Sequence, residues 1–523
     1  HEDGEDYVPS SKFTVFSHQF SSIAGAGPIN GPIQAAIFGW LPVLLWILIG
    51  GVFFGAVQDF ASMYASVKNK GRTIGYIIEE YIGKLGKKLF LLFCWLFCIL
   101  VVAAFADVVA GTFNGFAADK AGEVTKVVAN GAVATTSMLF IIEAVALGFF
   151  LKYSKFNKWI NTLVAIALLI VAIALGLNFP MYLNLGVWHI IIFVYILIAS
   201  VTPVWALLQP RDYLNSYLLI FMIVGAIIGV FVANPACNLD AFTAFAIPDA
   251  NGNPQYLFPI LFVTIACGAV SGFHSLVSSG TASKQIKNEK NMLPVSFGAM
   301  LMESMLAILA LIAVASFSKG EAAAQGLTTG AIANFLSVIG LPHSLVFTLI
   351  NLAVSAFALT SLDSVARVGR LSFQEFWLDS DTDDDNMSPF VKLMTNKYFA
   401  TIITLVLAFL LTKVGYAEIW PLFGSANQLL SVLALVACAV FLKKTKRQGC
   451  MLWIPMVFMM AVTFTALGMT IYKLTKALFS VGLDLGNSLQ LIFAVLLLIL
   501  GVLVAIQGVK KLCEKSESKK AAA

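Results

Sequence analysis

Polar and apolar residues alternate along this chain in long blocks, with apolar runs of about twenty residues separated by short polar segments. A run of that length crosses the hydrocarbon core of a bilayer as a helix. The pattern therefore predicts an all-α membrane protein with about 14 transmembrane helices. The expected spans are 17–38, 40–66, 89–116, 136–151, 159–178, 187–208, 214–233, 256–280, 294–318, 343–365, 398–412, 419–442, 451–472 and 488–508.

The first expected span contains residues that break helices. Glycine costs about 1 kcal/mol and proline about 3 kcal/mol inside a helix. In hydrocarbon the released N–H and C=O groups also need partners. Secondary transporters hold substrates and ions at such mid-bilayer breaks. The breaking residues of span 17–38 are Gly25, Gly27, Pro28, Gly31 and Pro32.

A second span, 256–280, is weakened in a similar way by Gly268, Ser271, Gly272 and the serines that follow. By our count it is the eighth span, so it runs antiparallel to the first. Two interrupted helices of opposite direction indicate an inverted-repeat transporter. The alternative is close helix packing through small residues, which needs no binding site.

The start of the second half of each broken helix offers free N–H groups and a partial positive charge. We expect these starts near Asn30–Gly31 and Ser271–Gly272, where they would suit an anionic or zwitterionic solute. His18 and His274 lie on the same two segments and could add hydrogen bonds or carry protons. Alternatively, each histidine is held by packing and one backbone bond.

Ionisable residues inside spans cost at least about 2.5–3.5 kcal/mol, so each is a functional candidate. Asp59, Asp107, Glu143, Glu303 and Asp363 are such residues. Asp363 follows Thr360-Ser361, whose hydroxyls could coordinate Na⁺, whereas the carboxylate could take a proton. A structural pair with Arg367, one turn away, is the alternative for Asp363. Asp107 and Glu303 are expected to be protonated or paired across helices.

Two further polar stretches are given structural roles. Arg211 and Asp212 are expected to pair with each other in a tight inner turn, and Asn427 and Gln428 to serve packing. The chain shows no phosphate loop, dinucleotide fingerprint, nucleophile elbow or metal-ligand spacing. We therefore expect no cofactor, no metal, no nucleic-acid partner and no enzymatic activity.

Composition and charge support this interpretation. The chain is 59% hydrophobic and 12% charged, with a mean hydropathy of +0.89. Soluble domains carry about 25% charged residues, so that class is excluded. With a cytoplasmic N-terminal segment, 27 of the 33 lysines and arginines fall on the inner side, as the positive-inside rule requires. We expect a multi-pass inner-membrane protein with a cytoplasmic C-terminus.

Several stretches resemble the carbon starvation protein A (CstA) family. They are Asp3-Gly4-Glu5-Asp6-Tyr7-Val8-Pro9, Ile23-Ala24-Gly25-Ala26-Gly27-Pro28-Ile29 with Gly31-Pro32, Gly55-Ala56-Val57-Gln58-Asp59, Gln209-Pro210-Arg211-Asp212-Tyr213, Cys267-Gly268-Ala269 with Ser271-Gly272-Phe273-His274-Ser275, and Trp420-Pro421-Leu422-Phe423-Gly424. The resemblance implies an inner-membrane importer of peptides or pyruvate. It also implies the five-plus-five inverted repeat of the amino acid–polyamine–organocation superfamily.

On that basis we expect one transmembrane domain over 1–523. Its inverted-repeat core would cover 14–442, with two extra helices between the repeats, and 451–508 would be accessory. Two departures from the family are visible. Family members carry a hydrophobic helix before the Asp-Gly-x-Asp-Tyr-Val-Pro stretch, whereas this sequence starts at that stretch. Ser17-His18-Gln19-Phe20 also stands where the family commonly has Gly-His-His-Phe.

The resulting hypothesis is an ion-coupled symporter for a small carboxylate-bearing solute, with protons favoured over Na⁺. A passive channel or a solute-binding sensor is the alternative, and the oligomeric state stays open. The coupling residues are expected among Asp59, Asp107, Glu303, Thr360, Ser361 and Asp363. The residues expected to bind the substrate are His18, Ser22, Ala24, Gly25, Gly27, Asn30, Gly268, Ser271 and His274.

Overall fold

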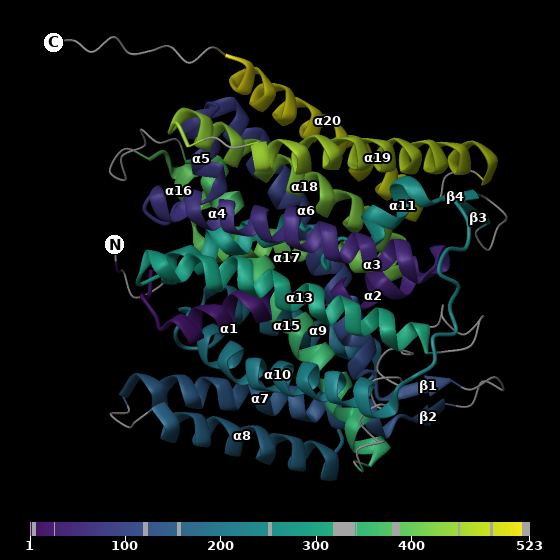
Figure 1. Cartoon of the computed structure of the whole chain (residues 1–523). Helices are drawn as coiled ribbons and strands as arrows, with labels where there is room; N and C mark the ends of the chain where they lie inside the picture. Colours follow the sequence, from purple (N-terminus) through teal and green to yellow (C-terminus); the bar gives the residue numbers. More distant parts are fainter. Residues whose placement is uncertain are drawn as a thin grey trace.

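Long helices running roughly along one common axis make up most of the computed structural model (Figure 1). The structure describes residues 2, 7–25, 27–118, 124–153, 158–248, 254–316, 340, 342–378, 387–447, 450–481 and 485–514.

Within these residues the helices are α1 (Lys12–Ile23), α2 (Gly27–Ala35), α3 (Trp40–Ile49), α4 (Ala56–Lys68), α5 (Ile74–Tyr81), α6 (Lys84–Phe113), α7 (Val128–Tyr153), α8 (Lys158–Asn178), α9 (Leu185–Val201), α10 (Leu208–Ala233), α11 (Leu257–Thr264), α12 (Gly272–Val277), α13 (Met292–Ala315), α15 (His343–Trp377), α16 (Pro389–Thr395), α17 (Lys397–Leu411), α18 (Tyr416–Lys444), α19 (Trp453–Val481) and α20 (Leu485–Cys513). The strands are β1 (Phe116–Ala118), β2 (Val124–Lys126), β3 (Ala246–Pro248) and β4 (Pro254–Tyr256).

Among the described residues, eleven helical segments are long and apolar enough to cross a membrane. A shorter apolar helix, α9, falls at another expected span. Two interrupted segments, α1–α2 and α11–α12, fall at the first and eighth expected spans. A mostly helical, multi-span architecture is thus confirmed, whereas the count of fourteen stays a prediction.

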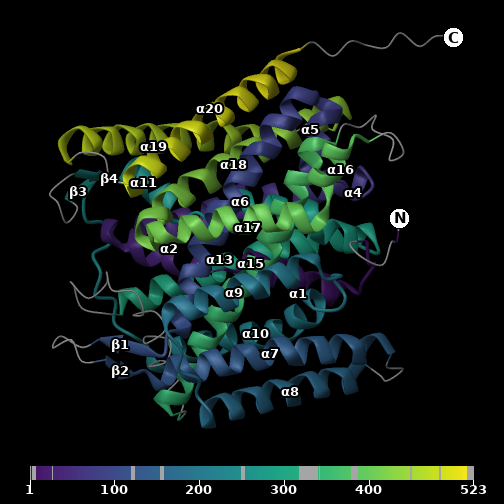
Figure 2. The ribbon, with the colours of Figure 1, turned by 180° about the vertical axis from the view of Figure 1, so that it is seen from behind.

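The centre of the bundle is formed by α6, α15 and α18. The most apolar 18-residue windows of these helices are 78%, 83% and 100% buried, whereas that of α8 is 17% buried. Helices α7 and α8 cover one side of the bundle and α19 and α20 the opposite side (Figures 1 and 2). The exposed face of α8 carries large apolar residues such as Leu163 and Ile170, which is the surface expected toward lipid.

The two ends of the bundle differ. Helices α5 and α16 lie at one end, where α1 also begins and α20 ends (Figure 1). Two antiparallel hairpins lie at the other end, and we call it the hairpin end. In these hairpins Ala117 pairs with Thr125, and Ile247 pairs with Gln255. The hairpins were not predicted, because three-residue strands are too short to show a period in the sequence.

Candidate functional site

The first expected break is present. Helix α1 ends at Ile23 and α2 begins at Gly27, with Ala24 and Gly25 outside helical structure. The second half therefore starts at Gly27 and not near Asn30–Gly31 as expected. Pro28 explains the shift, because proline lacks an N–H that the first turn of a helix would leave unpaired. Asn30 consequently lies one turn inside α2, half-buried.

The second break is also present, and it is longer. Helix α11 ends at Thr264, and α12 begins at Gly272. A π-helical segment, Ser278–Ala282, continues α12 and carries the hydroxyl of Thr281. The start of the second half at Ser271–Gly272 agrees with the prediction.

The two interrupted segments lie side by side and run in opposite directions. At the α5/α16 end, Ser10 N, just before α1, donates to Gln285 O, just after the π segment, over 3.0 Å. At the hairpin end, Thr243 N donates to Phe38 O over 3.1 Å, joining the loop before β3 to the residues after α2. The antiparallel prediction for the two broken segments is thus confirmed.

Small residues let the two breaks touch. A Cβ placed on Gly27 would lie 2.7 Å from Cys267 Cβ, and one on Gly31 would lie 2.7 Å from Thr264 O. Neither position has room for a side chain. The small-residue packing considered as an alternative is therefore present, and it brings the two open backbones together at one place.

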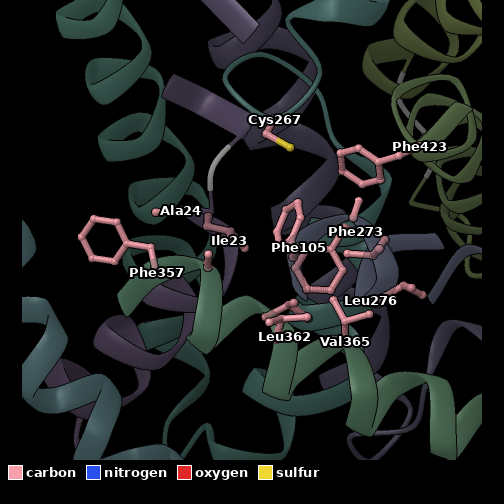
Figure 3. Packing of buried hydrophobic residues seen from close by; sticks show 14 of the residues in the cluster. Ile23, Ala24, Phe105, Cys267, Phe273, Leu276, Phe357, Leu362, Val365 and Phe423 are labelled. Carbon is pink, nitrogen blue, oxygen red and sulfur yellow. The ribbon is translucent and has the colours of Figure 1, made fainter. Parts of the chain in front are cut away.

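Apolar side chains surround the first break. Figure 3 shows Phe105, Phe273 and Phe423 gathered beside Ile23, with Cys267 of the second break nearby. The rings of Phe105 and Phe423 are 5.6 Å apart and meet edge to face. All three rings are buried, so they give the first break an apolar surrounding.

One buried polar group joins the second break to α4 and α13. We call it the His274 cluster: His274, Asp59 and Glu303, each with 0% of its surface exposed. His274 Nδ1 lies 3.2 Å from Asp59 Oδ2, and Nε2 lies 3.2 Å from Glu303 Oε2. Asp59 Oδ1 and both carboxylate oxygens of Glu303 have no hydrogen-bond partner of good geometry among the described residues. The sequence identified all three residues as candidates, but it did not predict that they contact one another.

A second buried group joins α1 to α9, α10 and α15. We call it the Arg211 cluster: His18, Tyr195, Arg211, Asp212 and Asp363. His18 Nδ1 lies 2.7 Å from Asp212 Oδ2, and Arg211 Nη2 lies 3.1 Å from Asp212 Oδ1. Arg211 Nη1 and the Tyr195 hydroxyl both bond Asp363 Oδ2. His18 Nε2 also lies 3.1 Å from Thr281 Oγ1 of the other broken segment.

This arrangement corrects the interpretation of Arg211 and Asp212. They do pair with each other, but not in a turn near the interface, because α10 already begins at Leu208. Both side chains point inward and are 3% and 0% exposed. The signal in the sequence was a pair of opposite charges close to the start of a long apolar run. For Asp363, the pairing found is with Arg211, and Arg367 donates to the carbonyls of Ala199 and Thr202.

The hydroxyl groups expected to hold Na⁺ bond protein atoms. Ser361 Oγ donates to Ser22 O over 3.0 Å, and Ser22 Oγ lies 2.9 Å from Ser364 Oγ. Asn215 Nδ2 donates to Thr360 Oγ1 over 2.8 Å. These contacts place Ser22, Thr360 and Ser361 beside the first break.

Asn427 was given a packing role, yet it bonds directly to the second break. Its Oδ1 accepts from Phe273 N over 3.0 Å, and its Nδ2 donates to Ser271 Oγ over 3.0 Å. One N–H group that we expected to face the solute is thus taken by the protein itself. Gln58 was also missed: its Nε2 donates to Ser271 O over 2.6 Å and to Ser275 Oγ over 2.8 Å.

Two expected residues have other surroundings. Asp107 pairs with His189 of α9 over 2.9 Å, and its side chain is 19% exposed. It is thus paired across helices, one of the two states expected, and its partner belongs to neither broken segment. Gly268 lies at the second break, where a Cβ would be 2.7 Å from Ala307 Cβ of α13.

Comparisons with known proteins agree with the sequence resemblance. The profile of the family described as "Carbon starvation protein CstA" matches residues 1–333 and 318–466. "Peptide transporter CstA" of Bacillus subtilis (strain 168) is 31% identical, with 98% of this chain and 90% of the relative covered. The protein of the same name in Escherichia coli (strain K12) is 31% identical, with 89% and 75% covered.

A third relative is "Pyruvate/proton symporter BtsT" of Escherichia coli (strain K12), which is 30% identical over 90% of this chain and 76% of the relative. Among solved structures, MhsT in complex with L-phenylalanine gives a TM-score of 0.48 at 14% identity, covering 96% and 99%. The family profile and the curated relatives show that this chain belongs to the carbon starvation protein CstA family.

Proposed function

We propose that this protein is a secondary transporter that imports a small carboxylate-bearing nutrient, pyruvate or a short peptide, together with protons. The observation that carries the proposal is the contact between two antiparallel interrupted helices in the middle of a membrane bundle. Each of them brings a buried histidine paired with a carboxylate. The names of the relatives support both solute classes.

The geometry favours a transport site because open backbone at membrane depth is tolerated where it is buried in protein or lines a cavity. Transporters use such half-helices for binding. The aromatic residues around the first break would receive the apolar part of a solute. The buried polar clusters beside it would receive its charge.

The charges of the His274 cluster favour protons as the coupling ion. Even with His274 protonated, two ionised carboxylates would leave one uncompensated negative charge in a fully buried site. Such a charge is costly away from water. A proton on Glu303 or Asp59 removes it. Na⁺ is the second candidate, and it would have to displace the hydrogen bonds among Ser22, Ser361 and Ser364.

The proposal includes the layout inferred from the family resemblance. The inverted-repeat core would cover 14–442, and 451–508 would be accessory. The α5/α16 end would face the cytoplasm, with the C-terminus on that side of the inner membrane. The antiparallel broken segments support this layout.

Uptake into proteoliposomes tests the proposal. Labelled pyruvate and labelled L-alanyl-L-alanine are supplied under an inward H⁺ gradient, an inward Na⁺ gradient or none. We expect accumulation above the external concentration of at least one solute with the H⁺ gradient. Equilibration without accumulation would favour a facilitator, and binding without entry would favour a sensor.

A further inference from the structure

Arg211 is a buried cation whose hydrogen-bonding capacity is incompletely used. Its side chain is 3% exposed and lies between two carboxylates, Asp212 and Asp363. Nη1 reaches Asp363 and the Tyr195 hydroxyl, and Nη2 reaches Asp212. Nε has no hydrogen-bond partner among the described residues. The planar fork of an arginine is built to hold a carboxylate by two parallel bonds.

Asp363 contacts this arginine through only one of its two carboxylate oxygens. Asp363 Oδ2 accepts from both Arg211 and Tyr195, whereas Oδ1 has no partner among the described residues, although the side chain is fully buried. An unpaired oxygen in such a place costs free energy, and protonation of that oxygen would turn it into a neutral hydroxyl. A carboxylate that bound the fork by two bonds would therefore compete well with Asp363.

The arginine also lies close to the first break. Asn215, one helical turn after Arg211 on α10, donates to Thr360. The next residue, Ser361, bonds Ser22 O, and its Oγ would lie 3.1 Å from a Cβ on Gly25. One turn of helix is about 5.4 Å. Arg211 thus lies one turn before a residue whose α15 partners pack on the first break, on the side toward the α5/α16 end.

We propose that Arg211 binds the carboxylate of the transported solute and that Asp363, displaced from it, carries the coupling proton. This inference rests on the proposed function and gives it a binding residue. One carboxylate and one proton enter together. The ion pair of Arg211 with Asp363 is replaced by one with the solute, and the proton resides on Asp363 Oδ1.

The charges around the pair fit this exchange. His18 faces it from α1, Tyr195 from α9 and Asp212 from α10, and Arg367 lies one turn from Asp363 on α15. Replacing an ionised Asp363 by a protonated one and an ionised solute leaves the net charge unchanged. An anionic solute that entered without a coupled proton would add an uncompensated negative charge to this buried cluster. Such a charge is costly in surroundings of low polarity.

The ligand class is therefore a free carboxylate on a small organic body. Pyruvate and the C-terminus of a peptide both carry one. A methyl ester or a C-terminal amide keeps the size but cannot form a charged pair with the guanidinium.

Competition on the unchanged protein gives the first test. Uptake of labelled pyruvate and of labelled L-alanyl-L-alanine is measured against unlabelled pyruvate, methyl pyruvate, L-alanyl-L-alanine and L-alanyl-L-alanine amide. We expect the two acids to compete at least about thirtyfold better than the ester and the amide, the range seen when one partner of a buried charge pair is lost. Equal competition by acid and ester or amide would overturn the proposal.

Variants give the second test. Arg211→Lys keeps the positive charge but loses the planar guanidinium, and we expect a higher KM. Lys87→Arg is the control: Lys87 lies in the first turn of α6, in a buried pair with Glu79, and this variant should leave KM unchanged. Asp363→Asn should bind and exchange pyruvate without accumulating it under an H⁺ gradient. Unchanged KM in Arg211→Lys, or full accumulation by Asp363→Asn, would overturn the proposal while leaving the transport function standing. If uptake is specific for the free acids but no ion gradient drives it, proton coupling is rejected, whereas the assignment of Arg211 as the carboxylate-binding residue stands.

Discussion

At the scale of residues, the protein keeps several charges away from water by placing opposite charges and histidines together. Breaking such a pair by removing one partner is strongly destabilising, because the other charge is left buried alone. Burying these charges also costs desolvation free energy, so the His274 and Arg211 clusters are weak as stabilising devices and are better explained by a functional role. Intramembrane ionisable groups with inward positions are functional candidates for this reason.

Glu303 gives the first prediction. Neither of its carboxylate oxygens has a hydrogen-bond partner of good geometry, so Glu303→Gln should fold and mimic the protonated state. We expect exchange of labelled for unlabelled solute to persist while H⁺-driven accumulation falls at least about tenfold, or about 1.4 kcal/mol.

Ser304→Ala is the matched control for Glu303, since Ser304 lies beside it and donates to Met300 O of its own helix. That variant should accumulate the solute as the parent does. Normal accumulation in Glu303→Gln would show that Glu303 takes no part in coupling.

The sequence revealed these residues unevenly. Asp59, Glu303 and Asp363 were identified because a charge inside an apolar run is unusual. Arg211 and Asp212 were assigned to a turn, because adjacent opposite charges at the edge of a run suggest a local pair. They do pair locally, but their further partners, His18 and Asp363, lie more than 150 residues away, and no local pattern reports such a contact.

At the scale of elements, glycine, proline and serine residues mark the breaks in α1–α2 and α11–α12. These residues predicted both interruptions, but not the partners of the released backbone groups. Asn427 supplies one of those partners from α18, a helix that passes the second break. Nothing in the sequence distinguished Asn427 from other polar residues, so only the structure shows its role.

The contact between the breaks predicts a steric effect at Gly31. A methyl group there would meet Thr264 O at 2.7 Å, and a backbone atom cannot move aside easily. Gly31→Ala should cost about 1–3 kcal/mol, the range for overpacking. Gly468→Ala, in α19 with nothing within 4 Å, should be neutral or slightly stabilising. Thermal unfolding in detergent compares the two, and equal melting temperatures would contradict the contact.

The cap on α12 predicts a further loss of stability. Asn427→Ala leaves the Phe273 N–H without its acceptor in a buried place, which should cost about 1–3 kcal/mol. Asn178→Ala removes an exposed amide that donates to Ala174 O and should change little. The same unfolding measurement applies, and an Asn427→Ala protein as stable as the parent would rule out this cap.

At the scale of the whole molecule, two antiparallel broken segments form contacts at both ends of the bundle. Transport by alternating access requires that the contacts at one end open while those at the other stay closed. The contact of Ser10 with Gln285 and Ile286 joins the two broken segments at the α5/α16 end. The Arg211 cluster lies between that contact and the first break.

A cross-link tests this movement. Ser10→Cys combined with Ile286→Cys places two thiols on paired backbone positions, so oxidation should join them. We expect oxidation to stop uptake and reduction to restore it. The two single variants, treated alike, should stay active. Full uptake by a fully cross-linked protein would mean that this end does not open during transport.

The most direct test of the central claim is to drive protons with the solute. Proteoliposomes with no initial pH difference and an internal pH-sensitive dye are given an inward gradient of pyruvate or of L-alanyl-L-alanine. We predict that the lumen becomes acidic as the solute enters, and that Asp363→Asn takes up the solute without acidification. Solute entry with no acidification in the unchanged protein would contradict proton coupling at this site.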